Sequence, residues 1–328
     1  MEQNKICILL SVYNGSHYIE EQLNSITTQD HTNLEILIRD DDSQDSSLKF
    51  LKHFAKQDSR ITLIQDSFGN NGVNGNFNLL MKNALQTSSQ YFAFADQDDV
   101  WQPDKLSSQL TKMQRAQTVY RDEPILVYSD MEVVDALLTS ISPSFMEYQS
   151  ISNVSKKPLN ILLTQNFIPG CTMLINRKLL EMVVPVPRGA LMYDWWIALC
   201  AATLGQIKFI AEPLVKYRQH GSNVVGARSI YNFINPFKSN WLDLWLTGKK
   251  NLLRSIFQAQ ALDKLIVKLD PSNQYSHLIK SYASILEQPP VQRVVKLFHQ
   301  GILPQPKIRQ LLNFSRILFL SKNSFPNC

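Results

Sequence analysis

The run YFAFADQDDVW at residues 91–101 ends an apolar stretch with three aspartates, Asp96, Asp98 and Asp99. A buried strand with such an ending projects carboxylates from the carboxyl edge of a sheet, where open α/β folds bind ligands. Crowded carboxylates repel one another unless a divalent cation lies between them, and Mg²⁺ or Mn²⁺ is the usual cation when a diphosphate supplies the remaining ligands. We therefore predict a site for a metal ion and a diphosphate, since helix capping would explain one aspartate and not three.

The motif SVYNG at 11–15 follows another predicted strand and would reach the same edge. Its polar groups, on Ser11, Tyr13 and Asn14, can meet a nucleotide base and ribose there, and the Tyr13 ring can stack on the base. The alternative is ordinary loop chemistry, because Asn-Gly marks a turn by itself.

The motif RDDDSQD at 39–45 ends the next predicted strand. A partly buried carboxylate at this position can accept the N3 hydrogen of uracil or thymine. Ser43 or Asp45 can also cap the helix that follows. The loop GNNGVNGN at 69–76 has a backbone that can approach a diphosphate, but it lacks the lysine of a phosphate-binding loop.

Two later motifs carry titratable side chains. Asp194 in YDWW begins an apolar helix, where it can act as an N-cap or as a general base. Arg218 and His220 lie in YRQHGSN, where arginine can clamp a phosphate and histidine can bind a metal. A surface histidine without such a role is the alternative.

Strands alternate with helices through the first half of the chain, which predicts a parallel sheet wound as in nucleotide-binding folds. We expect strands at 5–13, 34–41, 60–66, 91–96 and 125–135, and helices at 17–28, 46–57 and from the glycine-rich loop to about residue 88. Beyond this, we expect a strand that turns into a helix near Asn176, an apolar helix that ends at Gly205, and a strand at 208–220. Basic amphipathic helices follow, separated at Pro271, Pro289 and Pro304.

Length and composition fit a globular protein with one large α/β domain and an appendage. The 328 residues are 44% hydrophobic and 19% charged. We predict a domain at 1–228 and a helical region at 229–328. The four cysteines have no paired spacing, which suggests a reducing compartment and no zinc site. We expect no secretory signal and no transmembrane helix.

Charge is distributed unevenly. Residues 228–328 hold 14 Lys and Arg against 4 Asp and Glu, a net charge of +10, whereas residues 1–227 have a net charge of −5. A basic region on an acidic half predicts an anionic partner surface. Nucleic acid is disfavoured because the cations alternate with Leu, Ile and Phe at helical spacing, so an anionic membrane face fits better.

Taken together, SVYNG, RDDDSQD and DQDD make roughly the first 225 residues resemble a family 2 inverting glycosyltransferase with a GT-A fold. ADQDDVW, YDWW and YRQHGSN are similar to the bacterial rhamnosyltransferases of cell-wall and capsular polysaccharide synthesis. Asp42 stands where the wider family more often has glycine. Tyr193 replaces an acidic residue that often precedes the base, which leaves Asp194 as the candidate.

The resemblance implies a role for each site residue. Asp194 would take the proton of the acceptor hydroxyl as that oxygen attacks the anomeric carbon. Asp98 and His220 would hold Mg²⁺ or Mn²⁺, and Asp99 would support them. The donor nucleotide and its sugar would be bound by Ser11, Tyr13, Asn14, Asp40, Asp41, Asn76, Asp96 and Arg218.

The implied reaction moves L-rhamnose from dTDP-β-L-rhamnose to a hydroxyl of a lipid-linked polysaccharide intermediate, in the cytoplasm at the inner membrane face. A UDP-hexose donor is the alternative within the family. A nucleotidyltransferase could use the same carboxylates but would not need Asp194, and a non-catalytic membrane or carbohydrate-binding protein would not need the full set. The acceptor, the linkage and the oligomeric state, including a homo-oligomer, are left open.

Overall fold

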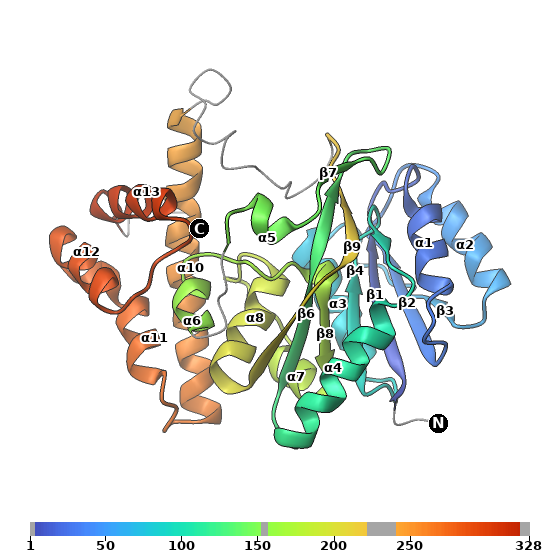
Figure 1. Ribbon diagram of the computed structural model, residues 1–328, viewed down its shortest axis with the longest axis horizontal. Coiled ribbons are helices and arrows are strands. Elements are labelled where there is room, and N and C mark those ends of the chain that lie inside the picture. Colours follow the sequence, from blue (N-terminus) through green and yellow to red (C-terminus); the bar gives the residue numbers. More distant parts are fainter. Residues whose placement is uncertain (1–3, 152–156, 222–240, 322–328) are drawn as a thin grey trace. The chain divides into compact units, whose positions relative to one another are not determined.

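The computed structural model describes residues 4–151, 157–221 and 241–321 (Figure 1). The chain forms two compact units that interleave in sequence. The first comprises Met1–Phe145, Ile168–Val186 and Gly205–Ala227, and the second comprises Met146–Phe167, Pro187–Leu204 and Arg228–Cys328. The domain boundary predicted at residue 228 lies outside the described residues and stays a prediction.

The first unit is built on a nine-stranded sheet in the order β3-β2-β1-β4-β8-β6-β9-β5, with β7 paired to β6. The strands are β1 (Ile6–Val12), β2 (Leu34–Asp40), β3 (Ile61–Leu63), β4 (Tyr91–Ala95), β5 (Val100–Trp101), β6 (Ile125–Val134), β7 (Ser140–Ser142), β8 (Met173–Asn176) and β9 (Gln206–Arg218).

The part of the sheet that ends in the predicted site motifs is parallel. β1 pairs with β2 and β4, and β2 pairs with β3, all in parallel, so their carboxyl ends meet at one edge. The other part is mixed, because β8 runs antiparallel to both β4 and β6, whereas β9 is parallel to β6. The predicted α/β fold is confirmed, and its parallel portion is the one that the βαβ alternation indicated.

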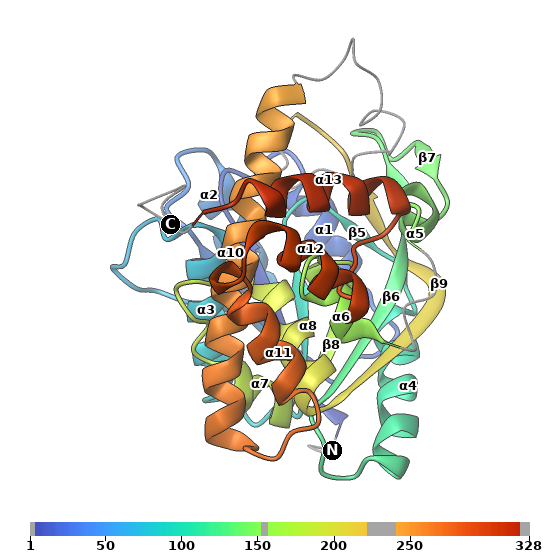
Figure 2. The same cartoon turned by 90° about the vertical axis from the view of Figure 1, so that its left-hand side faces the viewer.

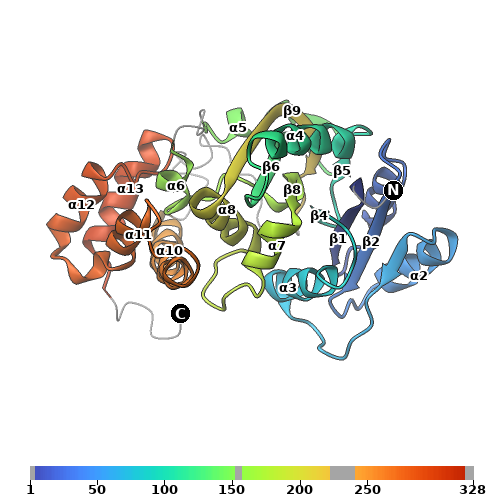
Figure 3. The same ribbon diagram turned by 90° about the horizontal axis from the view of Figure 1, so that it is seen from below.

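Alternation along the strands sorts the helices onto two faces of this sheet. Ile6, Ile8 and Leu10 pack in one core with side chains of α1 (Ile19–Thr27), α2 (Ser47–Gln57) and α4 (Lys105–Val119). The opposite face carries α3 (Gly72–Ala84) and α7 (Arg177–Val183), and there the Phe77 ring lies 6.0 Å from that of Phe94. Figure 3 shows α3 and α7 on one side of the strands and α4 on the other.

The second unit is helical (Figure 2). Its helices are α5 (Phe145–Tyr148, which begins on the last residue of the first unit's segment), α6 (Pro158–Leu162), α8 (Tyr193–Leu204), α10 (Trp241–Leu269), α11 (Ser276–Ala283), η3 (Ile285–Glu287), α12 (Pro290–His299) and α13 (Lys307–Leu318). The breaks predicted at the prolines are confirmed. Within the described residues, we find no helix that combines the length and the apolar content needed to cross a bilayer.

Almost every residue of α8 is buried, which explains its continuous apolar sequence. The Trp195 indole Nε1 donates to the Leu162 carbonyl oxygen at 2.6 Å, and the backbone N–H of Leu191, just before α8, donates to Oε1 of Gln258 in α10 at 2.9 Å. Cys7, Cys171 and Cys200 are buried free thiols.

Candidate active site

The turns that follow β1 and β2 are joined by hydrogen bonds from one motif to the other. The Asn14 N–H donates to Ser43 Oγ at 2.8 Å, and the Gln44 N–H donates to Asn14 Oδ1 at 2.8 Å. Asn14 and Asp42 both have positive φ, at 49° and 68°, which asparagine and aspartate tolerate better than most residues. Asp42 thus adopts a backbone conformation that glycine would adopt without strain.

The turn after β1 also meets the loop after β4. Gln97 bridges the two by accepting from the Tyr13 N–H at 2.7 Å and donating to the Tyr13 carbonyl oxygen at 2.9 Å. A Cβ at Gly15 would lie 2.5 Å from Gln97 Oε1, so this approach requires glycine. The Tyr13 side chain is left exposed beside this bridge.

Only one of the two carboxylate oxygens of Asp40, at the end of β2, accepts a hydrogen bond within the described residues. Its Oδ2 accepts from the Ser43 N–H at 3.0 Å, whereas Oδ1 is buried and has no hydrogen-bond partner among the described residues. A buried acceptor without a donor is costly. The Asp40 carboxylate therefore has an oxygen available for a donor that a ligand brings.

The start of α2 holds another ionised carboxylate, Asp45. Desolvation raises its pKa, but hydrogen bonds from Ser47 and Ser16 outweigh this and lower it to about 2. Its Oδ1 accepts from the Ser47 N–H at 2.9 Å and its Oδ2 from the Ser16 N–H at 3.0 Å. The N-cap residue of α2 is Ser46, so Asp45 supports the start of the helix from one position earlier and links it to the first turn.

Arg39 is fully buried beneath these turns and organises them. Its guanidinium binds the Asp66 carboxylate through two hydrogen bonds, of 2.7 and 2.9 Å, and also contacts Asp41. Nη1 donates to Asn76 Oδ1 at 3.1 Å, and Asn76 Nδ2 in turn donates to Ser11 Oγ at 2.7 Å. The structure therefore brings Ser11, Asp41 and Asn76 together through Arg39.

The loop after β4 meets the end of β9 at Asp98. Asp98 Oδ2 lies 2.9 Å from His220 Nε2, although 122 residues separate them. The His220 ring stacks on Tyr18, with ring centroids 4.7 Å apart. The predicted pair of metal-binding residues is thus adjacent.

Arg218 is buried, and its guanidinium contacts protein oxygens. Nε donates to the Asp98 carbonyl oxygen at 2.8 Å, Nη1 donates to that of Ala136 at 2.7 Å, and Nη2 pairs with Glu21. The guanidinium also lies 4.7 Å from the Tyr18 ring centre. These contacts make Arg218 a positioning residue for the loop, and its predicted contact with the donor stays a prediction.

A second acidic cluster lies deeper. One ligand atom each from Asp96, Asp99 and Cys171 falls within 4.8 Å of the others. Desolvation, then the charges of Asp98 and Asp96, raise the pKa of Asp99, and burial raises that of Cys171. Mg²⁺ and Mn²⁺ prefer oxygen ligands over a thiol. The carboxylates of this loop fit such a cation, whereas Cys171 does not.

Lys105 lies close to this cluster. Burial lowers its pKa to about 7. Its Nζ sits 3.9 Å above the Trp101 ring, which is itself buried. Trp101 therefore has a packing role beneath the loop.

Asp194 belongs to the second unit, whereas the other predicted site residues with described positions belong to the first. It is the second residue of α8 and is buried, and its Oδ1 accepts from the Trp195 N–H at 2.6 Å. Its predicted role as the base stays a prediction.

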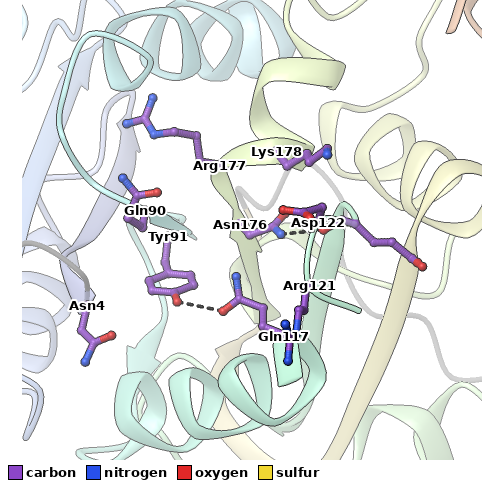
Figure 4. A pocket seen from close by; sticks show the side chains of 10 residues that line it. Asn4, Gln90, Tyr91, Gln117, Arg121, Asp122, Asn176, Arg177 and Lys178 are labelled. Carbon is purple, nitrogen blue, oxygen red and sulfur yellow. Dashed lines mark hydrogen bonds between the residues drawn. The ribbon is translucent and has the colours of Figure 1, made fainter. Parts of the chain in front are cut away.

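A cavity of about 440 Å³ in the first unit lies away from these motifs (Figure 4). It is lined at the amino end of β4, where the Tyr91 hydroxyl donates to Gln117 Oε1 at 2.9 Å. Asp96 follows the other end of this strand, so the cavity and the carboxylates occupy opposite edges of the sheet.

Sequence reasoning missed Tyr18, Glu21, Gln97 and Arg39. Tyr18 and Glu21 fall in an ordinary amphipathic helix, and only folding places them against Arg218 and His220. The role of Arg39 could have been predicted, because a charged residue in an otherwise apolar strand needs a buried partner.

Comparisons with known proteins agree on one family. The chain is 31% identical over 227 residues to an uncharacterized glycosyltransferase of Nostoc, covering 67% of this chain and 66% of that protein. It is 27% identical to the dTDP-rhamnosyl transferase RfbG of Shigella flexneri, covering 74% and 84%. It is 29% identical to the Escherichia coli glucosyltransferase WfgD, which uses UDP-Glc, covering 55% of this chain and 64% of that protein.

Solved structures show the same fold. S. aureus TarS in complex with UDP matches with a TM-score of 0.50 at 17% identity, covering 96% of this chain and 87% of that one. The mannosyltransferase PcManGT of Pyrobaculum calidifontis with GDP-Man and Mn²⁺ matches with a TM-score of 0.50 at 14% identity, covering 95% and 88%. The predicted GT-A type of fold is confirmed. The model of glycosyl transferase family 2 matches residues 7–183, more than half of the chain, and the chain therefore belongs to that family.

Proposed function

We propose that this glycosyltransferase moves L-rhamnose from dTDP-β-L-rhamnose, with inversion, to a hydroxyl of a bacterial polysaccharide intermediate. The observation that carries most weight is the 2.9 Å contact between Asp98 and His220, because it joins two motifs of the rhamnosyltransferase pattern at the edge where β1, β2 and β4 end. The likeness to RfbG supports the choice of sugar.

We assign recognition of the nucleobase to Asp40, at the end of β2. Asp40 Oδ1 is a buried acceptor without a donor among the described residues, and the N3–H of thymine or uracil would supply one. Asp41, Asn76 and Ser11, held through Arg39, would then meet the ribose and the sugar, and the exposed Tyr13 ring would cover the base.

We assign diphosphate binding, through a metal ion, to Asp98 and His220, and contact with the ribose or the sugar to Asp96. An oxygen and an imidazole nitrogen at 2.9 Å form a donor set that suits Mn²⁺ or Mg²⁺. When bound, such an ion neutralises negative charge on the leaving nucleoside diphosphate. Arg218 orients Asp98 through its carbonyl oxygen, and Tyr18 orients His220 through its ring.

We assign proton removal to Asp194. It lies in the first turn of α8, where the helix dipole favours a negative charge. It would accept the proton of the acceptor hydroxyl as that oxygen attacks the anomeric carbon from the side opposite the diphosphate.

A panel of dTDP-, UDP- and GDP-sugars tests the proposal. We expect dTDP-rhamnose to give release of dTDP that depends on a divalent cation. Preference for a UDP-hexose, as the likeness to WfgD would suggest, would replace the donor and leave the reaction type intact. Release of pyrophosphate would indicate nucleotidyl transfer and would refute sugar transfer. The acceptor would be a lipid-linked saccharide at the cytoplasmic membrane face, in keeping with the basic C-terminal region.

A further inference from the structure

Helix α12 exposes its apolar side. Val291, Val295 and Phe298 have exposed fractions of 68%, 48% and 64%, and their spacing of four and three residues places them on one face. Surface helices of globular proteins normally turn this face inward. The outward face of α12 therefore needs an explanation.

The explanation for its orientation is Arg293, which lies on the buried side. Its guanidinium donates to the carbonyl oxygens of Leu286 at 3.1 Å and Ile317 at 3.3 Å, and also to that of Leu320. Its Nε donates to the Gln288 carbonyl oxygen at 2.8 Å.

These oxygens lie near the ends of η3 and α13, where helices leave carbonyl groups without internal partners. Arg293 is thus a shared cap for two elements. It fixes the rotation of α12 so that Val291, Val295 and Phe298 stay outside.

Helix α13 extends the same kind of surface. It packs beside α12, as Figure 2 shows, and Leu311 and Phe319 are exposed on it or at its end. The charge of this part of the chain has one sign, since residues 288–328 contain six Lys and Arg and no Asp or Glu. By contrast, the exposed Val267 and Leu269 at the end of α10 lie in a segment, residues 263–270, whose two lysines are balanced by two aspartates.

We propose that the face formed by Val291, Val295 and Phe298 on α12, with Leu311 and Phe319 of α13, docks on an anionic lipid surface. An apolar stripe that enters the boundary between head groups and acyl chains, with cations beside it, is the arrangement by which helices lie on membranes. Lys296 and Lys307 would meet the lipid phosphates. The proposal does not depend on which sugar is transferred.

The start of α10, which also combines aromatic residues with cations, is a weaker candidate for this surface. Trp245 Nε1 donates to Ser315 Oγ of α13 at 3.1 Å. Lys249 lies over the Trp245 ring at 5.3 Å. Trp245 is therefore used within the helical unit, whereas the valines of α12 are free of such contacts in the described structure.

Vesicle flotation of the full chain tests the proposal. We expect the wild type to float with vesicles of phosphatidylglycerol and phosphatidylcholine, more weakly with phosphatidylcholine alone, and less as salt rises. The triple change Val291→Ser, Val295→Ser and Phe298→Ser should lower binding by roughly two orders of magnitude. Changing Lys296→Glu and Lys307→Glu should remove the preference for anionic vesicles.

The matched control is another set of three exposed apolar residues, Val119→Ser, Leu137→Ser and Ile141→Ser in the first unit, which should bind vesicles like the wild type. Failure of the wild type to float at low salt, or unchanged flotation of the triple variant, would overturn the proposal. So would a wild-type dimer that ignores vesicles and becomes monomeric in the triple variant, because the face would then bind a second copy. Donor hydrolysis, measured on the same samples, reports separately on the sugar-transfer proposal.

Discussion

The contact between Asp98 and His220 makes a specific prediction about metal dependence. Asp98→Ala should lose both turnover and the part of donor affinity that requires Mn²⁺, because the carboxylate would hold the ion that holds the diphosphate. Calorimetric titration of donor with and without Mn²⁺ measures this difference. Asp104→Ala, at an exposed aspartate before α4, should behave like the wild type. Equal donor affinity of Asp98→Ala and wild type under both conditions would remove Asp98 from the ligand set.

Tyr18 should act through its ring, since its centroid lies 4.7 Å both from the His220 ring and from the Arg218 guanidinium. Tyr18→Leu should raise the Mn²⁺ concentration that gives half-maximal activity by about tenfold, the effect expected when support of a metal ligand is lost. Tyr18→Phe keeps the ring and should restore the wild-type value. A purely structural role would instead lower thermal stability and activity together and leave the metal dependence unchanged.

Substitution of Asp194 should slow catalysis and leave donor binding nearly unchanged. Asp194→Asn should slow transfer by roughly 10²–10⁴-fold, the usual contribution of a general base, while donor affinity stays within a few-fold of the wild-type value. The amide keeps the size of the side chain and an oxygen for the Trp195 N–H. Single-turnover transfer and donor titration measure the two effects. Near-normal transfer would show that Asp194 is not the base and only stabilises the start of α8.

Among the elements, the junction of β1, β2 and α2 has a predictable response to acid. The pKa of Asp45 is lowered from 3.8 to about 2, so its contacts stabilise the fold above pH 3.8, and that stabilisation is lost as the pH falls through 2. Asp45→Asn should therefore lower the free energy of unfolding by about 1 kcal/mol at neutral pH, since the side chain is exposed and screened. Denaturant melts at pH 7 and pH 2.5 should show the difference shrinking. A difference that stayed constant with pH would mean that Asp45 stabilises the fold through the shape of its side chain and not through its charge.

How far the sequence predicts an element depends on whether its partners are local. The strand and turn motifs were predictable because each begins with a buried apolar run and ends in polar residues, and parallel strands bring those ends to one edge. The antiparallel insertion of β8 between β4 and β6 was not, because a short apolar strand carries no signal of direction. The stack of Tyr18 on His220 was also hidden, since it joins residues more than 200 positions apart.

The outward face of α12 was hidden for a related reason. Its apolar periodicity predicts a helix but leaves open which side faces the core. Arg293 decides this through carbonyl groups of segments before and after the helix. Such a contact depends on the packed unit, and neither the spacing nor the composition of residues 290–299 reveals it.

For the molecule as a whole, the predicted domain boundary and the packing of α8 lead to opposite expectations for a chain that ends at residue 227. The boundary predicts that this fragment folds alone, whereas the packing of α8 predicts that it does not. Residues 146–167 and 187–204 lie before the boundary but belong to the second unit. Eleven of the twelve residues of α8 are buried, and the segments at its two ends bond to α10 and to the turn beyond it through Gln258 and Asn273. Removing everything after residue 227 deletes α10 and takes away that cover.

We therefore expect the chain that ends at residue 227 to aggregate, because the loss of α10 exposes the apolar surface of α8. Size-exclusion chromatography and thermal melting measure this, and a chain that ends at residue 321 is the control, since it keeps every described helix. The control should melt like the full chain. A monomeric fragment of residues 1–227 with a cooperative melt would establish that the predicted domain folds alone, and that α8 does not need α10 for its stability.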